Sequence, residues 1–131
     1  MTQIVDRKLA SPVPSPETAA FWEGTGNGVF NLRWCRACNK THWYPRAICP
    51  HCFSDDTEWR PASGKGEIHA FSVMSRADPV YVVAFVTLEE GPTMMTNLVE
   101  CDSDKLGIGQ KVELVFKDTE DGMKLPMFKP V

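Results

Sequence analysis

Two Cys-x-x-Cys pairs constrain this 131-residue chain more than any other feature. They lie in "WCRACNKTHWYPRAICPHC", residues 34–52, and ten residues separate them. The four cysteines are Cys35, Cys38, Cys49 and Cys52. Zinc prefers four such thiolates in a tetrahedron with bonds of about 2.3 Å, and a site closed by four protein ligands is structural. The spacing therefore predicts a structural zinc site in a region that has almost no hydrophobic core of its own.

Other readings of the cysteine cluster stay open at this point. The same four thiolates can hold iron, one pair can work as a redox dithiol, and His42 or His51 can replace a cysteine as ligand. A redox dithiol needs one pair and normally lies at the start of a helix, and four cysteines leave no need for a histidine. Zinc predicts a colourless protein with one zinc per chain, whereas a red protein would contradict it.

The start of the chain bears on the state of these thiols. "MTQIVDRKLASPVPSP" lacks an apolar run followed by a cleavage site, so we expect no secretory leader. No stretch approaches the roughly 18 to 20 apolar residues that span a bilayer. We therefore expect a cytoplasmic protein without a membrane segment, whose cysteines stay reduced. The fifth cysteine, Cys101, ends the strand-like "NLVEC" and is expected to be a small buried apolar residue.

The segment before the cysteines divides into an arm and a helix. Residues 1–14 are expected to be extended, because prolines at 12, 14 and 16 alternate with small residues. "SPETAAFWEG" then predicts a helix of about nine residues with Ser15 as its N-cap and Pro16 in the first helical position. So short a helix is marginal in water, so Phe21 and Trp22 must dock on this chain or on a partner.

The remaining sequence predicts a mainly β protein. "VFNLRW" (29–34) and "THWYP" (41–45) are short strands that carry the cysteine turns, which is typical of a rubredoxin-like zinc ribbon. Five segments rich in β-branched and aromatic residues follow and predict a small five-stranded OB-fold barrel; they are 64–76, 79–91, 93–101, 111–116 and 124–130. The expected units are thus the arm 1–14, helix and ribbon 15–62, and barrel 63–131.

One expected strand, "VYVVAFV" (80–86), is apolar on both faces. A strand with one face in solvent alternates apolar and polar residues. Either the N-terminal segment or another protein must therefore cover its outer face.

No catalytic constellation accompanies these elements. The sequence has no nucleophile elbow and no nucleotide-binding glycine loop, and His42, His51 and His69 are scattered. We expect no catalytic residue.

The charge of the chain is unevenly distributed. Residues 33–65 carry six Lys or Arg against three Asp or Glu, and residues 66–131 carry six Lys or Arg against eleven Asp or Glu.

The order of parts resembles one family. A helix with "FW", a strand into the first cysteine pair, "YPRAICPHC" (44–52), "LGIGQKVELVF" (106–116) and a final "PMFKP" (126–130) are similar to the zinc-ribbon/OB-fold proteins of domain-of-unknown-function family thirty-five. The likeness covers roughly residues 15–131. The family often has glycine after its second cysteine pair, where this chain has Phe53.

The resemblance implies a non-catalytic accessory subunit. Members pair with thiolase-like proteins (thiolases, acyltransferases or aldolases) that act on acyl-CoA thioesters, and their zinc is structural. It implies that Cys35, Cys38, Cys49 and Cys52 are the zinc ligands. If CoA contacts this chain, its phosphates need cations, for which Arg46 and Lys65 are candidates; Arg33, Arg36, Lys40 and Arg60 lie nearby in the sequence.

Two other functions compete with this one. A zinc ribbon next to an OB-fold is also common in proteins that bind single-stranded nucleic acid, and Trp34, Trp43, Tyr44 and Phe71 could stack on bases. The net charge of −5 over residues 66–131, six positive against eleven negative, opposes such binding, because phosphate neutralisation dominates it. A stand-alone acyl-CoA carrier is the third reading, which acyl-CoA binding by the isolated chain would favour.

Overall fold

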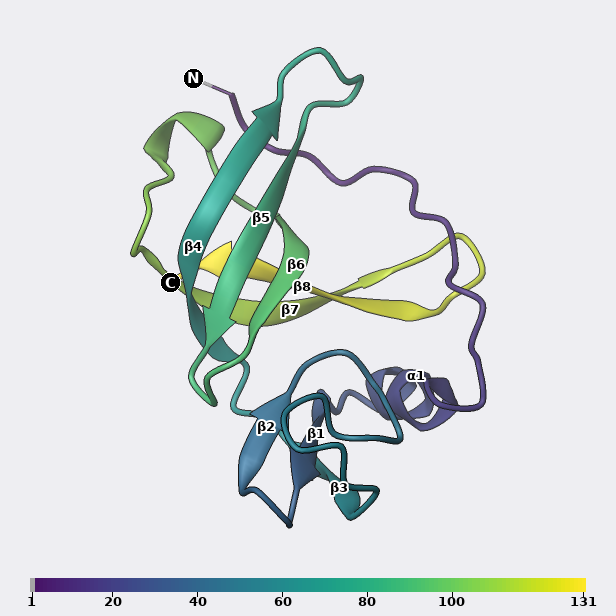
Figure 1. The fold of residues 1–131 in the computed structure, drawn as a ribbon. Helices are drawn as coiled ribbons and strands as arrows, with labels where there is room; N and C mark the ends of the chain where they lie inside the picture. Colours follow the sequence, from purple (N-terminus) through teal and green to yellow (C-terminus); the bar gives the residue numbers. More distant parts are fainter. Residues whose placement is uncertain (1) are drawn as a thin grey trace.

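A small zinc-ribbon sheet and a closed barrel make up the fold in the computed structural model, which describes residues 2–131 (Figure 1). The sheet has the order β2–β1–β3 and is antiparallel. Its strands are β1 (Asn31–Cys35), β2 (Lys40–His42) and β3 (Thr57–Pro61). The sequence predicted β1 and β2 but not β3, whose full pairing with β1 closes the ribbon on its second side.

The barrel follows and confirms the expected five strands. They are β4 (Lys65–Met74), β5 (Tyr81–Leu88), β6 (Thr93–Leu98), β7 (Lys111–Asp118) and β8 (Lys124–Pro130), with a 3₁₀ turn η1 (Ser103–Lys105) before β7. The barrel closes in the order β4–β5–β6–β8–β7. All pairs are antiparallel except β6 with β8, which meet in parallel at Leu98 and Phe128. A register shift in β4 between Ile68 and Ala70 adds the bend that closure of a small barrel requires.

One hydrophobic core joins the two parts. Alternate residues of β5 point into the barrel and are buried, as the period of two requires. The same cluster continues through Phe128 to Phe30, whose ring centroids lie 6.4 Å apart, and to Phe21 of the helix. Phe21 packs edge-on against Trp22, Phe30 and Trp43. The short helix is therefore docked within its own chain.

The helix α1 (Ala19–Gly26) starts later than its sequence predicts. The expected N-cap at Ser15 is wrong, because a tight turn precedes the helix and Thr18 takes the cap position. The Ser15 backbone N–H donates to Thr18 Oγ1 at 2.8 Å, and the Ser15 carbonyl accepts from the N–H groups of Thr18 and Ala19. Within residues 2–131, no helix has the length and apolar character needed to cross a membrane.

The N-terminal arm runs along the outside of the barrel before it reaches α1 (Figure 1). The Ile4 N–H donates to the Cys101 carbonyl at 2.8 Å, and the Arg7 guanidinium lies 4.2 Å from the centre of the Tyr81 ring. The arm therefore covers one end of the outer face of β5. Further along that strand, Phe85 is 46% exposed beside its cross-strand partner Met95, which is 62% exposed.

Candidate metal centre and its surroundings

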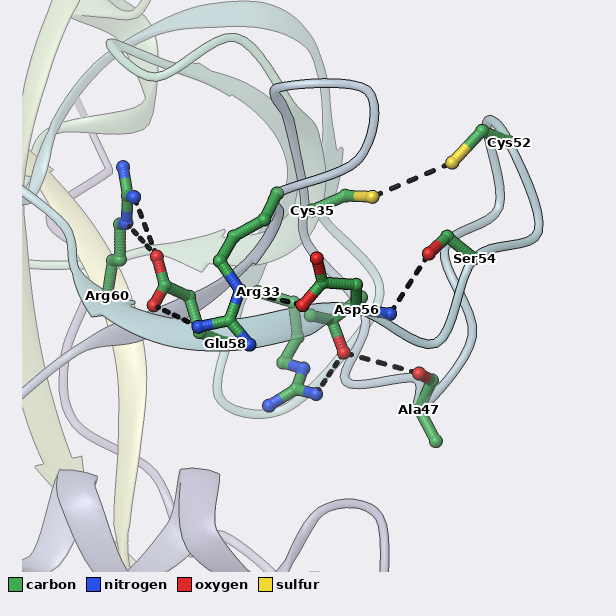
Figure 2. Close-up of polar contacts among 10 residues, drawn as sticks. Arg33, Cys35, Ala47, Cys52, Ser54, Asp56, Glu58 and Arg60 are labelled. Carbon is green, nitrogen blue, oxygen red and sulfur yellow. Dashed lines mark hydrogen bonds and ion pairs between the residues drawn. The ribbon is translucent and has the colours of Figure 1, made fainter.

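The ribbon brings the four cysteines together. Cys35 ends β1, Cys38 follows in the turn before β2, and Cys49 and Cys52 lie in the long loop between β2 and β3. Their four Sγ atoms all lie within 4.8 Å of one another. The Cys35 and Cys52 sulfurs are 3.6 Å apart and face each other (Figure 2), and those of Cys38 and Cys49 are 3.7 Å apart.

These distances suit a tetrahedral metal ion and not disulfides. Zinc–sulfur bonds of about 2.3 Å at tetrahedral angles place the sulfurs about 3.8 Å apart, whereas a disulfide joins sulfurs at about 2.05 Å. Four thiols supply all four positions, which leaves none for substrate or water. The chain thus has a four-cysteine zinc ribbon whose donor set is suitable for zinc. His42 and His51 are not part of this group.

Both cysteine turns have the same backbone form. Asn39 and Phe53, each directly after a cysteine pair, have left-handed φ angles of 63° and 66°. In each turn the N–H of that residue donates to the carbonyl of the first cysteine at 2.9 Å. Asn is one of the residues that tolerate this conformation, so Asn39 fits its turn. Phe53 adopts it as well, although a bulky side chain disfavours it.

The crowded thiols differ in acidity. Burial, followed by hydrogen bonding from the neighbouring thiols, raises the pKa of Cys38 to about 12. Burial also raises the pKa of Cys49, but the backbone N–H groups of Cys52 and His51 outweigh it and lower that pKa to about 7. The His51 N–H lies 3.4 Å from the Cys49 sulfur. A divalent cation is what allows four sulfurs so close together to be thiolates at once.

Three arginines of the ribbon are held by neighbours. Arg36 pairs with Asp56 at 2.7 Å and with Glu58 at 3.3 Å, and Arg60 pairs with Glu58 at 2.6 Å. Arg33 donates to Thr57, whose hydroxyl donates in turn to the Ala47 carbonyl, and its guanidinium lies 4.5 Å from the centre of the Trp59 ring. Figure 2 shows Arg60 turned toward Glu58 and Asp56 beside the cysteine loop. The Thr57–Ala47 bond ties the second cysteine loop to β3, and the Arg36 pairs tie the first cysteine turn to Asp56 and β3.

The two residues proposed from the sequence for CoA phosphates lie apart. Arg46 lines a hollow between the ribbon and the β5–β6 turn. Lys65 lines another, formed by the start of β4, the end of β5 and β7. The structure therefore does not bring these two cations to one site.

His42, the last residue of β2, is buried, although from the sequence it was only an alternative zinc ligand and one of three scattered histidines. His42 is 5% exposed, and neither ring nitrogen has a hydrogen-bond partner in the part of the chain that the structure describes. Burial is the main cause that lowers its pKa. The nearby backbone of Arg46 raises the pKa and so opposes burial, whereas the charge of Arg33 lowers it further. Its position at the end of a short strand carried no signal that its ring nitrogens would lack partners.

Two domain families match the sequence. Residues 22–58 match "ChsH2, rubredoxin-like zinc ribbon domain", and residues 59–117 match "ChsH2, C-terminal OB-fold domain". Both matches agree with the two architectures seen in the structure.

Curated relatives are similar over most of the chain. A "DUF35 domain-containing scaffold protein" of Methanothermobacter thermautotrophicus is 38% identical over 100 residues, which cover 68% of this chain and 75% of the relative. A "Probable enoyl-CoA hydratase alpha subunit" of Thermomonospora curvata is 34% identical over 117 residues. That match covers 85% of this chain, which spans 37% of the length of the relative.

Solved structures have the same fold. A chain described as "Ltp2-ChsH2(DUF35) aldolase" superimposes with a TM-score of 0.81 at 31% identity, covering 92% of this chain and 98% of the other. A Sulfolobus solfataricus protein of the DUF35 family has a TM-score of 0.67 at 13% identity, with 88% and 86% covered, and supports the fold alone.

Proposed function

This chain belongs to the DUF35 family, with ChsH2-type zinc-ribbon and OB-fold domains, and on that premise we propose that it is a non-catalytic accessory subunit. Its partner is a thiolase-like enzyme (a thiolase, acyltransferase or aldolase) that acts on acyl-CoA thioesters. Two similar proteins, described as "Ltp2-ChsH2(DUF35) aldolase" and "Probable enoyl-CoA hydratase alpha subunit", support a role beside an enzyme.

The observation that carries this proposal is an uncovered apolar pair on the barrel. Phe85 and Met95 lie directly opposite each other on β5 and β6, and both have exposed side chains. The barrel is closed, so this face has no free strand edge to extend. Partner binding must therefore use side chains, and exposed aromatic and methionine residues are the types enriched in protein interfaces. The N-terminal arm leaves this pair open, as it reaches β5 at Tyr81.

The zinc ribbon has a structural role in this proposal. Cys35, Cys38, Cys49 and Cys52 bind one zinc ion, and the ion fixes the two cysteine turns against the short sheet. All four positions around the metal are taken by sulfur, so the ion has no open position for a substrate. The reaction then belongs to the partner, and this chain supplies a docking surface for it.

Purification from the native host tests the proposal. A tagged chain should retain a thiolase-like enzyme in a fixed ratio, identified by mass spectrometry. The Phe85→Asp variant should lose that enzyme, because a carboxylate would be buried in the interface. Val13→Asp is the matched control, since Val13 is exposed on the arm, away from this pair. Circular dichroism checks that both variants fold. Equal retention of the enzyme by Phe85→Asp, or recovery of the chain alone, contradicts the proposal.

A further inference from the structure

Lys40 and Arg46 are two cations that the ribbon leaves free. Arg33, Arg36 and Arg60 are held by intramolecular contacts. Neither Lys40 nor Arg46 has an ion pair or side-chain hydrogen bond within residues 2–131. Both line the same hollow, which lies between the ribbon and the β5–β6 turn. In the folded chain, the three paired arginines are thus occupied, whereas Lys40 and Arg46 are unpaired and line one hollow.

The hollow has a volume of about 640 Å³, within the usual range for small-molecule sites. Aromatic side chains form much of its wall. Trp43 is packed against Phe21 and Phe30, and Trp34 already has the Arg60 guanidinium 4.4 Å from its ring centre. Tyr44 is 59% exposed and is the open ring of this wall. A planar group can stack there without displacing a contact of the core.

His42 and Glu90 are also part of the polar lining. His42 is buried at the hollow and both of its ring nitrogens lack partners, so a water or ligand atom that reaches the ring would satisfy one of them. Glu90 lies on the β5–β6 turn at the opposite wall, and its carboxylate accepts a hydrogen bond from the Ser63 backbone N–H at 2.8 Å. The positive groups are thus on the ribbon side and the carboxylate is on the barrel side.

From this combination we propose that the hollow binds a nucleotide, with its base stacked on Tyr44 and its phosphates at Lys40 and Arg46. A planar ring next to phosphate groups matches an open aromatic ring next to two unpaired cations. Lys65 lies in a different hollow and takes no part. This inference rests on the proposed function, in which the partner enzyme acts on acyl-CoA thioesters. The bound nucleotide is then the nucleotide end of a CoA thioester.

Calorimetric titration of the zinc-loaded full chain tests this inference without a partner enzyme. CoA and adenosine 3′,5′-bisphosphate should bind with similar affinity, and pantetheine, which lacks the nucleotide, should not bind. Arg46→Ala and Lys40→Ala should each weaken binding by about tenfold, as expected for the loss of a hydrogen bond to a charged group. Lys65→Ala is the matched control, because it removes an equal charge from another hollow and should change nothing.

Each other outcome overturns part of the inference. If adenosine 3′,5′-bisphosphate fails to bind, or if Arg46→Ala binds as the parent does, the hollow is no nucleotide site. If a single-stranded oligonucleotide binds more tightly than CoA and depends on Arg46, assignment of the ligand to a CoA thioester is wrong. The Phe85→Asp experiment tests partner binding separately. Nucleotide binding can therefore fail while the accessory role stands, and the accessory role can fail while nucleotide binding stands.

Discussion

The ribbon and the barrel hold their strands together by different means. The ribbon strands have five, three and five residues, and the second cysteine loop is mostly exposed. The barrel strands have six to ten residues and enclose a continuous apolar core. Burial of apolar area is enough to stabilise the second arrangement, whereas the first depends on metal–ligand bonds.

The boundary between the part stabilised by metal and the part stabilised by the apolar core lies within the ribbon. Leu32 and Phe30 belong to the same core as Phe128 of the barrel. The cysteine turns on the far side of the sheet have no such support. Metal dependence should therefore be confined to the outer part of the ribbon, from about residue 35 to residue 57.

Removal of the metal should have the largest effect. A chelator, or the Cys49→Ser variant, should release the two cysteine turns, since structural zinc sites contribute on the order of 10 kcal/mol or more to folding. Hydrogen exchange measured by mass spectrometry should show rapid exchange in residues 36–56 and continued protection in β5 and β8. Equal loss of protection in the barrel would contradict the division between metal-held and core-held regions.

Truncation of the shared core comes next in size. Phe128→Ala should reduce the free energy of unfolding by about 3–5 kcal/mol, the usual cost of removing a fully buried Phe side chain. Urea unfolding followed by circular dichroism measures this loss, and zinc content should stay at one per chain. Val131→Ala, at an exposed position, is the control and should change little. A loss below about 1 kcal/mol at Phe128 would show that the barrel does not rely on this side chain.

The left-handed residue of the second cysteine turn offers a gain in stability. Phe53→Gly should stabilise the zinc-bound chain by about 1 kcal/mol, because glycine has no Cβ to strain at positive φ. Little packing is lost, since Phe53 is 79% exposed. Asn39→Gly at the equivalent position should gain less, because Asn tolerates this conformation. Thermal unfolding in the presence of zinc compares the two, and an equal or opposite order would contradict the strain at Phe53.

Acid should weaken the ribbon through His42, with the smallest effect of the four. Burial is the main cause that lowers the pKa of this side chain below its ordinary 6.5 in the folded state. The neutral form is therefore favoured by folding, so its contribution is present above pH 6.5 and is lost as pH falls through and below that value. His42→Phe should flatten the decline of stability between about pH 7.5 and about pH 5.5, measured by urea unfolding. An unchanged slope would show that His42 does not titrate with unfolding.

Much of this molecule follows from local sequence. The cysteine spacing predicts the ribbon, and five β-rich segments bounded by turn residues predict the barrel. Strand β3 was missed because "TEWRP" carries two charges and ends in proline, and only its pairing with β1 makes it a strand. The helix start was misplaced because Ser15 and Thr18 form a turn in preference to a cap.

The hollow at the ribbon could not be read from the sequence at all. It joins residues 34–51 to residues 90–93, and their proximity depends on how the barrel docks on the ribbon. From the sequence alone, Arg46 and Lys65 were the candidates for phosphate binding, and Arg33, Arg36, Lys40 and Arg60 were only nearby cations. Ion pairs and stacking then engaged three of them and left Lys40 and Arg46 together, which is a property of the folded chain.

Acyl-CoA turnover tests the accessory role most directly. The enzyme captured with the tagged chain should be assayed alone, with the chain added back, and with the Phe85→Asp variant added back. The proposed role predicts no turnover by the chain alone, impaired turnover by the separated enzyme, and recovery with the parent chain but not with the variant. Turnover by the isolated chain, or full activity of the enzyme without it, would contradict the account.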